Sequence, residues 1–161
     1  MKLTINHLAP YLPYGLEGQI GSSGGTFGKL LGLKDEFFCY AETTYTKWPG
    51  NEGRWNGLNL HDFKPLLLPL SKLTEEIEHN GKKYCILSLW YSLPVKEEEA
   101  YEVYGTIPEY WKTVVDNIEK NGLRYIDYGF VKILLEHHFD CFKLIPNGLA
   151  LDKSTINQHQ P

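Results

Sequence analysis

Residues 11–33 read YLPYGLEGQIGSSGGTFGKLLGL, and this stretch decides the fold class of the first half of the chain. Its middle, Gly21–Gly25, contains only glycine and serine, which tolerate the positive φ angles of tight turns. The flanking segments Tyr11–Ile20 and Thr26–Leu33 each have the length and apolar content of a strand. The stretch therefore predicts a β-hairpin.

Two more strands are predicted on the C-terminal side of this hairpin. Glu36–Tyr45 is rich in aromatic residues and threonine, which favour a pleated surface. Phe63–Leu70 also has strand character, but Pro65 and Pro69 lack the backbone N–H that a ladder needs and so predict an edge position. Together the four strands predict a small antiparallel sheet or partial barrel over residues 1–70.

The second half of the chain predicts mainly helices. Thr106 and Glu109 have the spacing of a capping box, and Pro108 suits the first turn of a helix. Apolar side chains then recur at helical spacing as far as Asn121. The other predicted elements are a short helix from Ser71 with Leu73 and Ile77 on one face, a strand at Tyr84–Tyr91, a helix at Tyr125–Phe139 and a last strand around Leu149 and Leu151.

The length and composition are those of one globular domain. The chain has 161 residues, of which 42% are hydrophobic and 14% aromatic, and this composition argues against intrinsic disorder. We therefore expect a single α+β domain over residues 1–161. It should be mainly β over residues 1–70 and mainly α over residues 71–152, with a polar tail at 153–161.

Charge and cysteine usage limit the classes of partner. The net charge of −4 does not favour direct contact with duplex nucleic acid, because proteins bind its phosphate backbone through positively charged surfaces. No apolar run reaches the length of a membrane span, and the first residues lack the apolar region of a secretory signal. The three cysteines form no CxxC pair, so no zinc ribbon is indicated. We expect a cytoplasmic protein, and a homo-oligomer stays open.

Two segments resemble chemical motifs without matching them. Gly28-Lys29 is followed by Leu30, where a phosphate-binding loop needs serine or threonine, so a flexible hairpin explains the glycines. The segment Glu136–Cys141 brings together potential metal ligands, but these do not share one helix face. His137 is then interpreted as a core histidine, and Glu136, His138 and Asp140 as solvated. The sequence therefore predicts no catalytic residue, no metal and no cofactor.

An aromatic and basic loop is the strongest candidate for a ligand site. The glycine-rich segment 46–57 and the residue before it contain two tryptophans, two cations and a tyrosine: Tyr45, Lys47, Trp48, Arg54 and Trp55. Indole faces stack on nucleobases, and nearby cations bind phosphate. Tryptophan and arginine also dominate protein interfaces. The alternative is that both indoles fold back and plug the open end of the small sheet.

Three blocks of sequence resemble a known group of proteins. Residues 8–16 read LAPYLPYGL, residues 64–77 read KPLLLPLSKLTEEI, and residues 135–152 contain LEHHFD, LI and GLALD. In this order they resemble small uncharacterised proteins of phages and prophages of Bacteroidota. The resemblance implies a viral accessory protein that works in the cytoplasm of a bacterial host. The aromatic and basic loop belongs to none of the blocks, as a variable recognition loop would.

These observations favour a non-enzymatic binding protein that sequesters or blocks a host factor. The partner would be a nucleotide-type small molecule, such as a signal in anti-phage defence, or a host protein. The alternative is an accessory factor in phage DNA metabolism or assembly that acts through protein–protein contacts. An enzyme would require His137, Glu136 or a cysteine to converge in one pocket.

Overall fold

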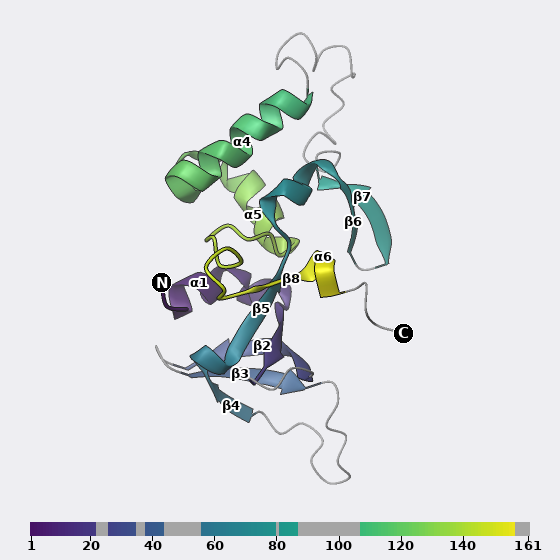
Figure 1. Cartoon of the computed structure of the whole chain (residues 1–161). Helices are drawn as coiled ribbons and strands as arrows, with labels where there is room; N and C mark the ends of the chain where they lie inside the picture. Colours follow the sequence, from purple (N-terminus) through teal and green to yellow (C-terminus); the bar gives the residue numbers. More distant parts are fainter. Residues whose placement is uncertain (22–25, 35–37, 44–55, 80, 87–106, 157–161) are drawn as a thin grey trace. The chain divides into compact units, whose positions relative to one another are not determined.

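The chain forms two compact units in the computed structural model. The described residues are 1–21, 26–34, 38–43, 56–79, 81–86 and 107–156. The first unit combines Met1–Leu68 with Phe142–Pro161, and the second is the continuous segment Pro69–Cys141. Strands dominate the N-terminal half and helices the C-terminal half (Figure 1), so the predicted α+β class is confirmed. That the chain is one domain stays a prediction.

The first unit is built on a six-stranded sheet. The order of strands across it is β4-β3-β2-β1-β5-β8, and every neighbouring pair is antiparallel except β5 with β8. Its strands are β1 (Glu17–Ile20), β2 (Thr26–Leu33), β3 (Phe38–Thr43), β4 (Asn56–Asn59), β5 (Phe63–Leu67) and β8 (Leu151–Asp152). The predicted hairpin is the β1–β2 pair, and the bounds of β2 are those expected from the sequence.

The segment before β1 is helical, which corrects the predicted strand over Tyr11–Ile20. The helix α1 (Ile5–Leu8) continues into a 3-10 helix, η1 (Ala9–Tyr14), and Gly15 ends it at a φ of 69°. Pro10 and Pro13 fix φ near the helical value, so they are compatible with the tight turns of η1. Only the last four residues of the predicted strand remain extended.

The strand β5 lies inside the sheet, which corrects the edge position predicted from its prolines. It pairs with β1 on one side, where Pro65 faces Gly18, and with β8 on the other. The parallel pairing with β8 involves only Leu66 and Leu67, so Pro65 stands outside that ladder. A proline is tolerated here because the second neighbour begins beyond it.

The core of the first unit forms between the sheet and the helical N-terminal segment. Leu8 and Tyr11 from the helices, and Leu16, Leu30 and Phe63 from the sheet region, are almost completely buried. The ring of Phe142 contacts the rings of His7 and Tyr11, at centroid distances of 5.8 Å and 5.9 Å. The C-terminal segment of the chain is therefore packed into this unit by aromatic contacts.

The second unit contains a hairpin and two helices. A 3-10 helix, η3 (Leu70–Thr74), leads into the strands β6 (Glu76–His79) and β7 (Lys82–Cys85), which pair antiparallel. The helices are α4 (Ile107–Asn121) and α5 (Tyr128–Glu136), joined by the 3-10 helix η4 (Gly122–Tyr125). The predicted end of α4 is confirmed.

Two other predicted elements of the second half are corrected. The helix expected from Ser71 stops at Thr74, and Ile77 lies on β6, where its side chain is buried. Gly81 does not stop a helix but lies between the hairpin strands, with a φ of 72°. The helix expected at Tyr125–Phe139 is shorter, because Asp127 caps it. The predicted strand at 84–91 is described only as far as residue 86.

The C-terminal region differs from the expected polar tail. Residues Lys153–Ile156 form a short helix, α6, directly after β8. Asp152 holds this turn, because one of its carboxylate oxygens accepts hydrogen bonds from the backbone N and the hydroxyl of Ser154, at 2.9 Å and 2.6 Å. Residues 157–161 lie outside the described part. None of the helices in the described ranges has the length and apolar character that crossing a membrane requires.

Candidate functional site

The five residues predicted to bind a ligand lie outside the described part of the chain. Tyr45, Lys47, Trp48, Arg54 and Trp55 all belong to the segment 44–55. Only the end of the predicted loop is described, and there Asn56 begins β4. That these residues form a ligand site stays a prediction.

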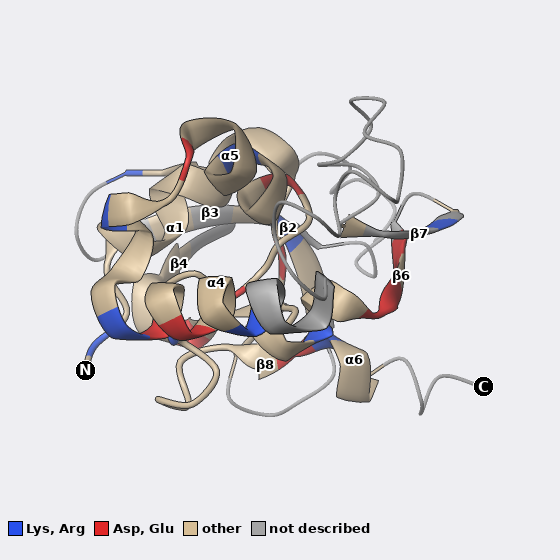
Figure 2. Cartoon of the chain, turned by 90° about the horizontal axis from the view of Figure 1, so that it is seen from above, with Lys and Arg blue, Asp and Glu red and all other residues tan. Residues whose placement is uncertain are grey.

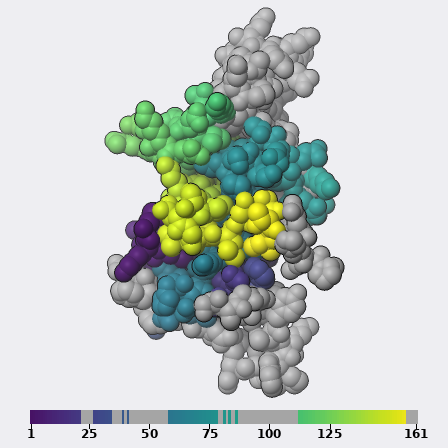
Figure 3. Space-filling model, in the orientation of Figure 1, coloured from purple at the N-terminus to yellow at the C-terminus, as the bar shows by residue number. Residues whose placement is uncertain are grey.

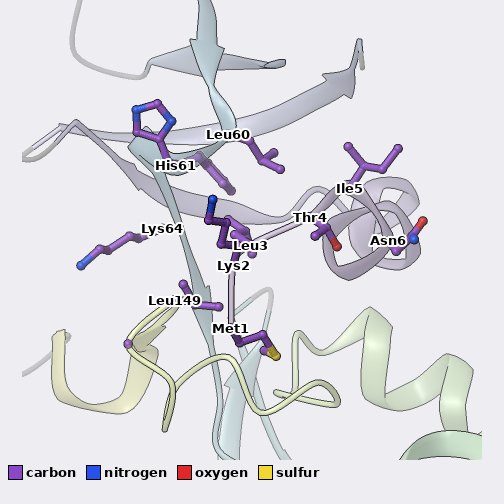
Figure 4. Close-up of a pocket in the computed structure, with 12 residues that line it drawn as sticks. Met1, Lys2, Leu3, Thr4, Ile5, Asn6, Leu60, His61, Lys64 and Leu149 are labelled. Atoms are coloured by element: carbon purple, nitrogen blue, oxygen red, sulfur yellow. The ribbon is translucent and has the colours of Figure 1, made fainter. Parts of the chain in front are cut away.

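A pocket of about 670 Å³ lies in the first unit (Figure 4). Three chain segments that are far apart in the sequence line it: residues 1–6, residues 60–64 and the pair Gly148 and Leu149. The space-filling view in Figure 3 shows the purple N-terminal residues beside the yellow-green C-terminal segment. The pocket therefore exists only because the fold brings both ends of the chain to the sheet.

The N-terminal wall is fixed by the cap of α1. Thr4 has an extended backbone, and its N–H donates to Nδ1 of His7 at 3.1 Å. The hydroxyl of Thr4 lies 3.1 Å from the same nitrogen. The ring of His7 thus reaches back to the backbone N–H of Thr4, as the third helical residue does in a capping box, and satisfies this donor. This cap orients Leu3 and Ile5, both half-buried, along the pocket.

The sheet wall is formed by the turn that leads into β5. This 3-10 turn, η2 (Leu60–Asp62), is held by the N–H of Gly21, which donates to the carbonyl of Asp62 at 2.8 Å. Leu60 and Phe63 are 3% and 0% exposed and supply the apolar floor. His61 and Lys64, between and beyond them, are exposed and also line the pocket.

The third wall is a tight turn of the C-terminal segment. The N–H of Gly148 donates to the carbonyl of Ile145 at 2.9 Å, and the N–H of Leu149 donates to that of Leu144 at 2.8 Å. Gly148 has a φ of 69°, a left-handed conformation that glycine adopts without strain. The turn holds the half-buried side chain of Leu149 at the pocket (Figure 4).

The polar groups of the pocket are basic or neutral. Lys2, His61 and Lys64 line it, and within the part of the chain that the structure describes no aspartate or glutamate does. Nε2 of His61 lies 3.5 Å from a carboxylate oxygen of the neighbouring Asp62, whose other oxygen accepts a hydrogen bond from Asn59 at 3.2 Å. The pocket thus combines an apolar floor with positive charge at its rim.

Residues 137–141 are buried within the second unit, whereas Glu136 is exposed, as the sequence indicated. His137 is 6% exposed, and its Nδ1 donates to the carbonyl of Ile133 at 2.8 Å, so it is a core histidine as the sequence indicated. His138 and Asp140 are also buried, at 5% and 4%, which corrects their interpretation as solvated side chains. The described residues contain no group of three or more histidine, cysteine or acidic side chains that could hold a metal ion.

Cys39 does not have the environment of a nucleophile. Cys39 and Cys141 are both buried and form no disulfide. Burial of Cys39, together with the negative charge of Asp62, raises the pKa of its thiol to about 11. Reactive thiols need a lowered pKa and access to solvent, and Cys39 has neither.

Comparison of the chain with models of protein families, with curated proteins and with solved structures finds no match. The site is therefore assigned from its geometry. Sequence reasoning missed the pocket because none of its walls has a motif of its own. The one signal available was that Lys64, Gly148 and Leu149 fall within the sequence blocks 64–77 and 135–152 quoted above.

Proposed function

We propose that this protein is a non-enzymatic binding protein that takes up a small molecule in the pocket of its first unit. The observation that carries the proposal is the pocket itself. Its volume of about 670 Å³ falls within the range of about 300–1,000 Å³ that is typical of small-molecule sites. Its apolar floor and few polar groups are also the usual composition of such sites.

Binding is favoured over catalysis by the chemistry of the lining. A hydrolytic or transfer reaction needs a nucleophile paired with a base, or two groups that exchange protons. Among the described lining residues, Thr4 has its hydroxyl beside a base, 3.1 Å from Nδ1 of His7, but the same ring nitrogen accepts a hydrogen bond from the backbone N–H of Thr4. Capping the helix accounts for this contact, so the pair supports structure and not chemistry.

The biological role in this proposal is to sequester or block a host factor. The resemblance of three sequence blocks to phage and prophage proteins supports a viral accessory protein in a bacterial cytoplasm. A nucleotide-type signal of host defence would combine a flat apolar body with negative charge. The loop with Tyr45, Lys47, Trp48, Arg54 and Trp55 would then supply a second contact surface, for the same molecule or for a host protein.

Mass spectrometry of small molecules that co-purify with the full chain tests the pocket. The variant Leu149→Trp fills the pocket, and Leu123→Trp enlarges a half-buried leucine of η4 that does not line it. We expect wild type and Leu123→Trp to retain the same molecule and Leu149→Trp to lose it. Equal retention by all three proteins, or retention by none, would count against the proposal.

Titration with nucleotides tests the contribution of the loop. Because stacking on an aromatic side chain is worth about 1–3 kcal/mol per base, Trp48→Ala or Trp55→Ala should weaken binding by that amount. Tyr128→Ala is the matched control, because Tyr128 is an exposed aromatic residue of α5. Unchanged affinity in both tryptophan variants would show that the loop is not part of the binding site. The pocket itself would then be tested by Leu149→Trp alone.

A further inference from the structure

The charge of the pocket is opposite in sign to that of the chain. The sequence has 20 acidic and 16 basic residues, yet the described lining residues include Lys2, His61 and Lys64 and no aspartate or glutamate. Figure 2 shows the N-terminal end of the ribbon in blue, the colour of lysine and arginine. A local concentration of one charge around an apolar hollow selects among small molecules by their charge.

The two ammonium groups of the pocket are available to a ligand. Among the described residues, neither Lys2 nor Lys64 has a carboxylate within salt-bridge distance, in contrast to Lys72, whose Nζ lies 2.7 Å from Glu75. Lys64 is exposed on β5 at the position that faces Gln19 of β1, a neutral neighbour. A ligand that brings a negative charge to this rim therefore does not have to displace an ion pair within the described part of the molecule.

The apolar side of the pocket lies next to these charges. Leu60 begins the turn that presents His61, and Phe63 follows that turn. Leu149 approaches from the C-terminal segment (Figure 4). An apolar body placed on these side chains leaves water, while its charged end stays at the wet rim. Neither a small inorganic anion nor a neutral hydrocarbon would use both halves of the site.

We infer that the ligand of this pocket is an amphipathic anion, with an apolar or aromatic body and one acidic head group. The body packs against Leu60, Phe63 and Leu149, and the head group binds Lys2 and Lys64, with His61 as a further hydrogen-bonding partner. This inference rests on the proposed function, because it names the class of molecule that the binding protein takes up.

Two fluorescent dyes that differ in a single charged group test the inference on the full chain. Anilinonaphthalene sulfonate and N-phenyl-1-naphthylamine share one aromatic skeleton, and only the first carries a sulfonate. We expect the anionic dye to bind more tightly, with an affinity that falls as salt is added. Lys64→Gln or Lys2→Gln should lower the affinity for the anionic dye by about two- to fivefold and leave the affinity for the neutral dye unchanged.

Control variants separate failure of the inference from failure of the proposed function. Lys132→Gln removes an exposed lysine of α5 and should change neither titration. Equal affinity for the two dyes, both lost in Leu149→Trp, would overturn the inference and keep the pocket as a binding site. Dye binding that Leu149→Trp leaves unaffected, or no binding of either dye, would overturn both.

Competition then distinguishes the two sources of such an anion. Adenosine monophosphate has a flat body with a phosphate, and decanoate has an aliphatic body with a carboxylate. Displacement of the sulfonate dye by the first assigns the site to nucleotide-type ligands, and displacement by the second assigns it to fatty-acid-like ligands. If neither displaces the dye at millimolar concentration, the inferred class is wrong.

Discussion

At the residue scale, Cys39 makes the stability of the protein depend on pH. Its thiol is fully buried on β3, and desolvation is the main reason why its pKa rises from 9.0 to about 11. Between these two pH values the unfolded chain loses the thiol proton and the folded chain keeps it. The free energy of unfolding should therefore fall as pH rises from 9 to 11, by about 3 kcal/mol in total, and stay unaffected by this group below pH 9.

Denaturant unfolding at several pH values measures this loss. Tyrosines and lysines titrate in the same range, so the comparison is between wild type and Cys39→Ala, which differ only at the thiol. The stability difference between the two proteins should narrow between pH 9 and pH 11. Parallel curves over that range would show that the thiol is not the group responsible.

Gly18 has little room for a side chain. A methyl group there would come within 2.6 Å of Cε2 of Phe63 and 2.8 Å of the carbonyl oxygen of Lys64, and Phe63 is fully buried. Because the ring has no free space to enter, Gly18→Ala should lower the free energy of unfolding by about 1–3 kcal/mol. Chemical denaturation checks the value.

A double-mutant cycle identifies the cause of the Gly18 effect. If the ring is the obstacle, Gly18→Ala should cost less in a Phe63→Leu background than in wild type. An equal cost in both backgrounds would mean that the close contact with the ring does not determine stability.

At the scale of elements, the start of α5 depends on one side chain. An oxygen of Asp127 accepts hydrogen bonds from the N–H groups of Gly129 and Phe130, at 2.8 Å and 3.3 Å. Asp127→Ala should therefore destabilise the protein by about 0.5–2 kcal/mol. Asp127→Asn keeps an acceptor at the same place and should recover most of the loss in thermal unfolding. If Asp127→Asn is as unstable as Asp127→Ala, the hydrogen bonds of the cap are not the source of the lost stability.

The elements that sequence predicts well are those whose ends have their own chemistry. The strand β2 follows the glycine- and serine-rich sequence 21–25, and α4 ends at Asn121 before a glycine with a φ of 64°. The failures fall where a local pattern fits two structures. The apolar residues of 11–16 were compatible with a strand, but Tyr11 and Leu16 are buried from a 3-10 helix and its exit. Tertiary packing, which sequence does not display, decides such cases.

The candidate site could not be predicted for a related reason. Its walls come from residues 1–6, 60–64 and 148–149, and no spacing rule relates segments so far apart. Lys64 and Leu149 have no special meaning until the fold brings them to one pocket. The loop residues that do have a recognisable pattern, Trp48 and Trp55 among them, stay a prediction.

At the scale of the whole molecule, the division into two units predicts separate responses to core mutations. Leu134 of the second unit and Leu30 of the first are almost completely buried, and truncation of such a leucine to alanine costs about 2–5 kcal/mol. Leu134→Ala should raise the hydrogen-exchange rates of the backbone amides in α4 and α5 more than those in β1 and β2. Leu30→Ala should have the opposite effect. Equal acceleration everywhere in both variants would instead support one cooperative domain.

The parallel pair of β5 with β8 has a consequence for synthesis. Leu66 leaves the ribosome roughly 85 residues before Leu151, its partner in the ladder, which takes about 4–17 s at typical translation rates. During that time one side of β5 offers backbone groups to any other extended chain nearby. Yield from rapid overexpression should therefore depend on supplying a chaperone that covers an apolar strand until its late neighbour arrives.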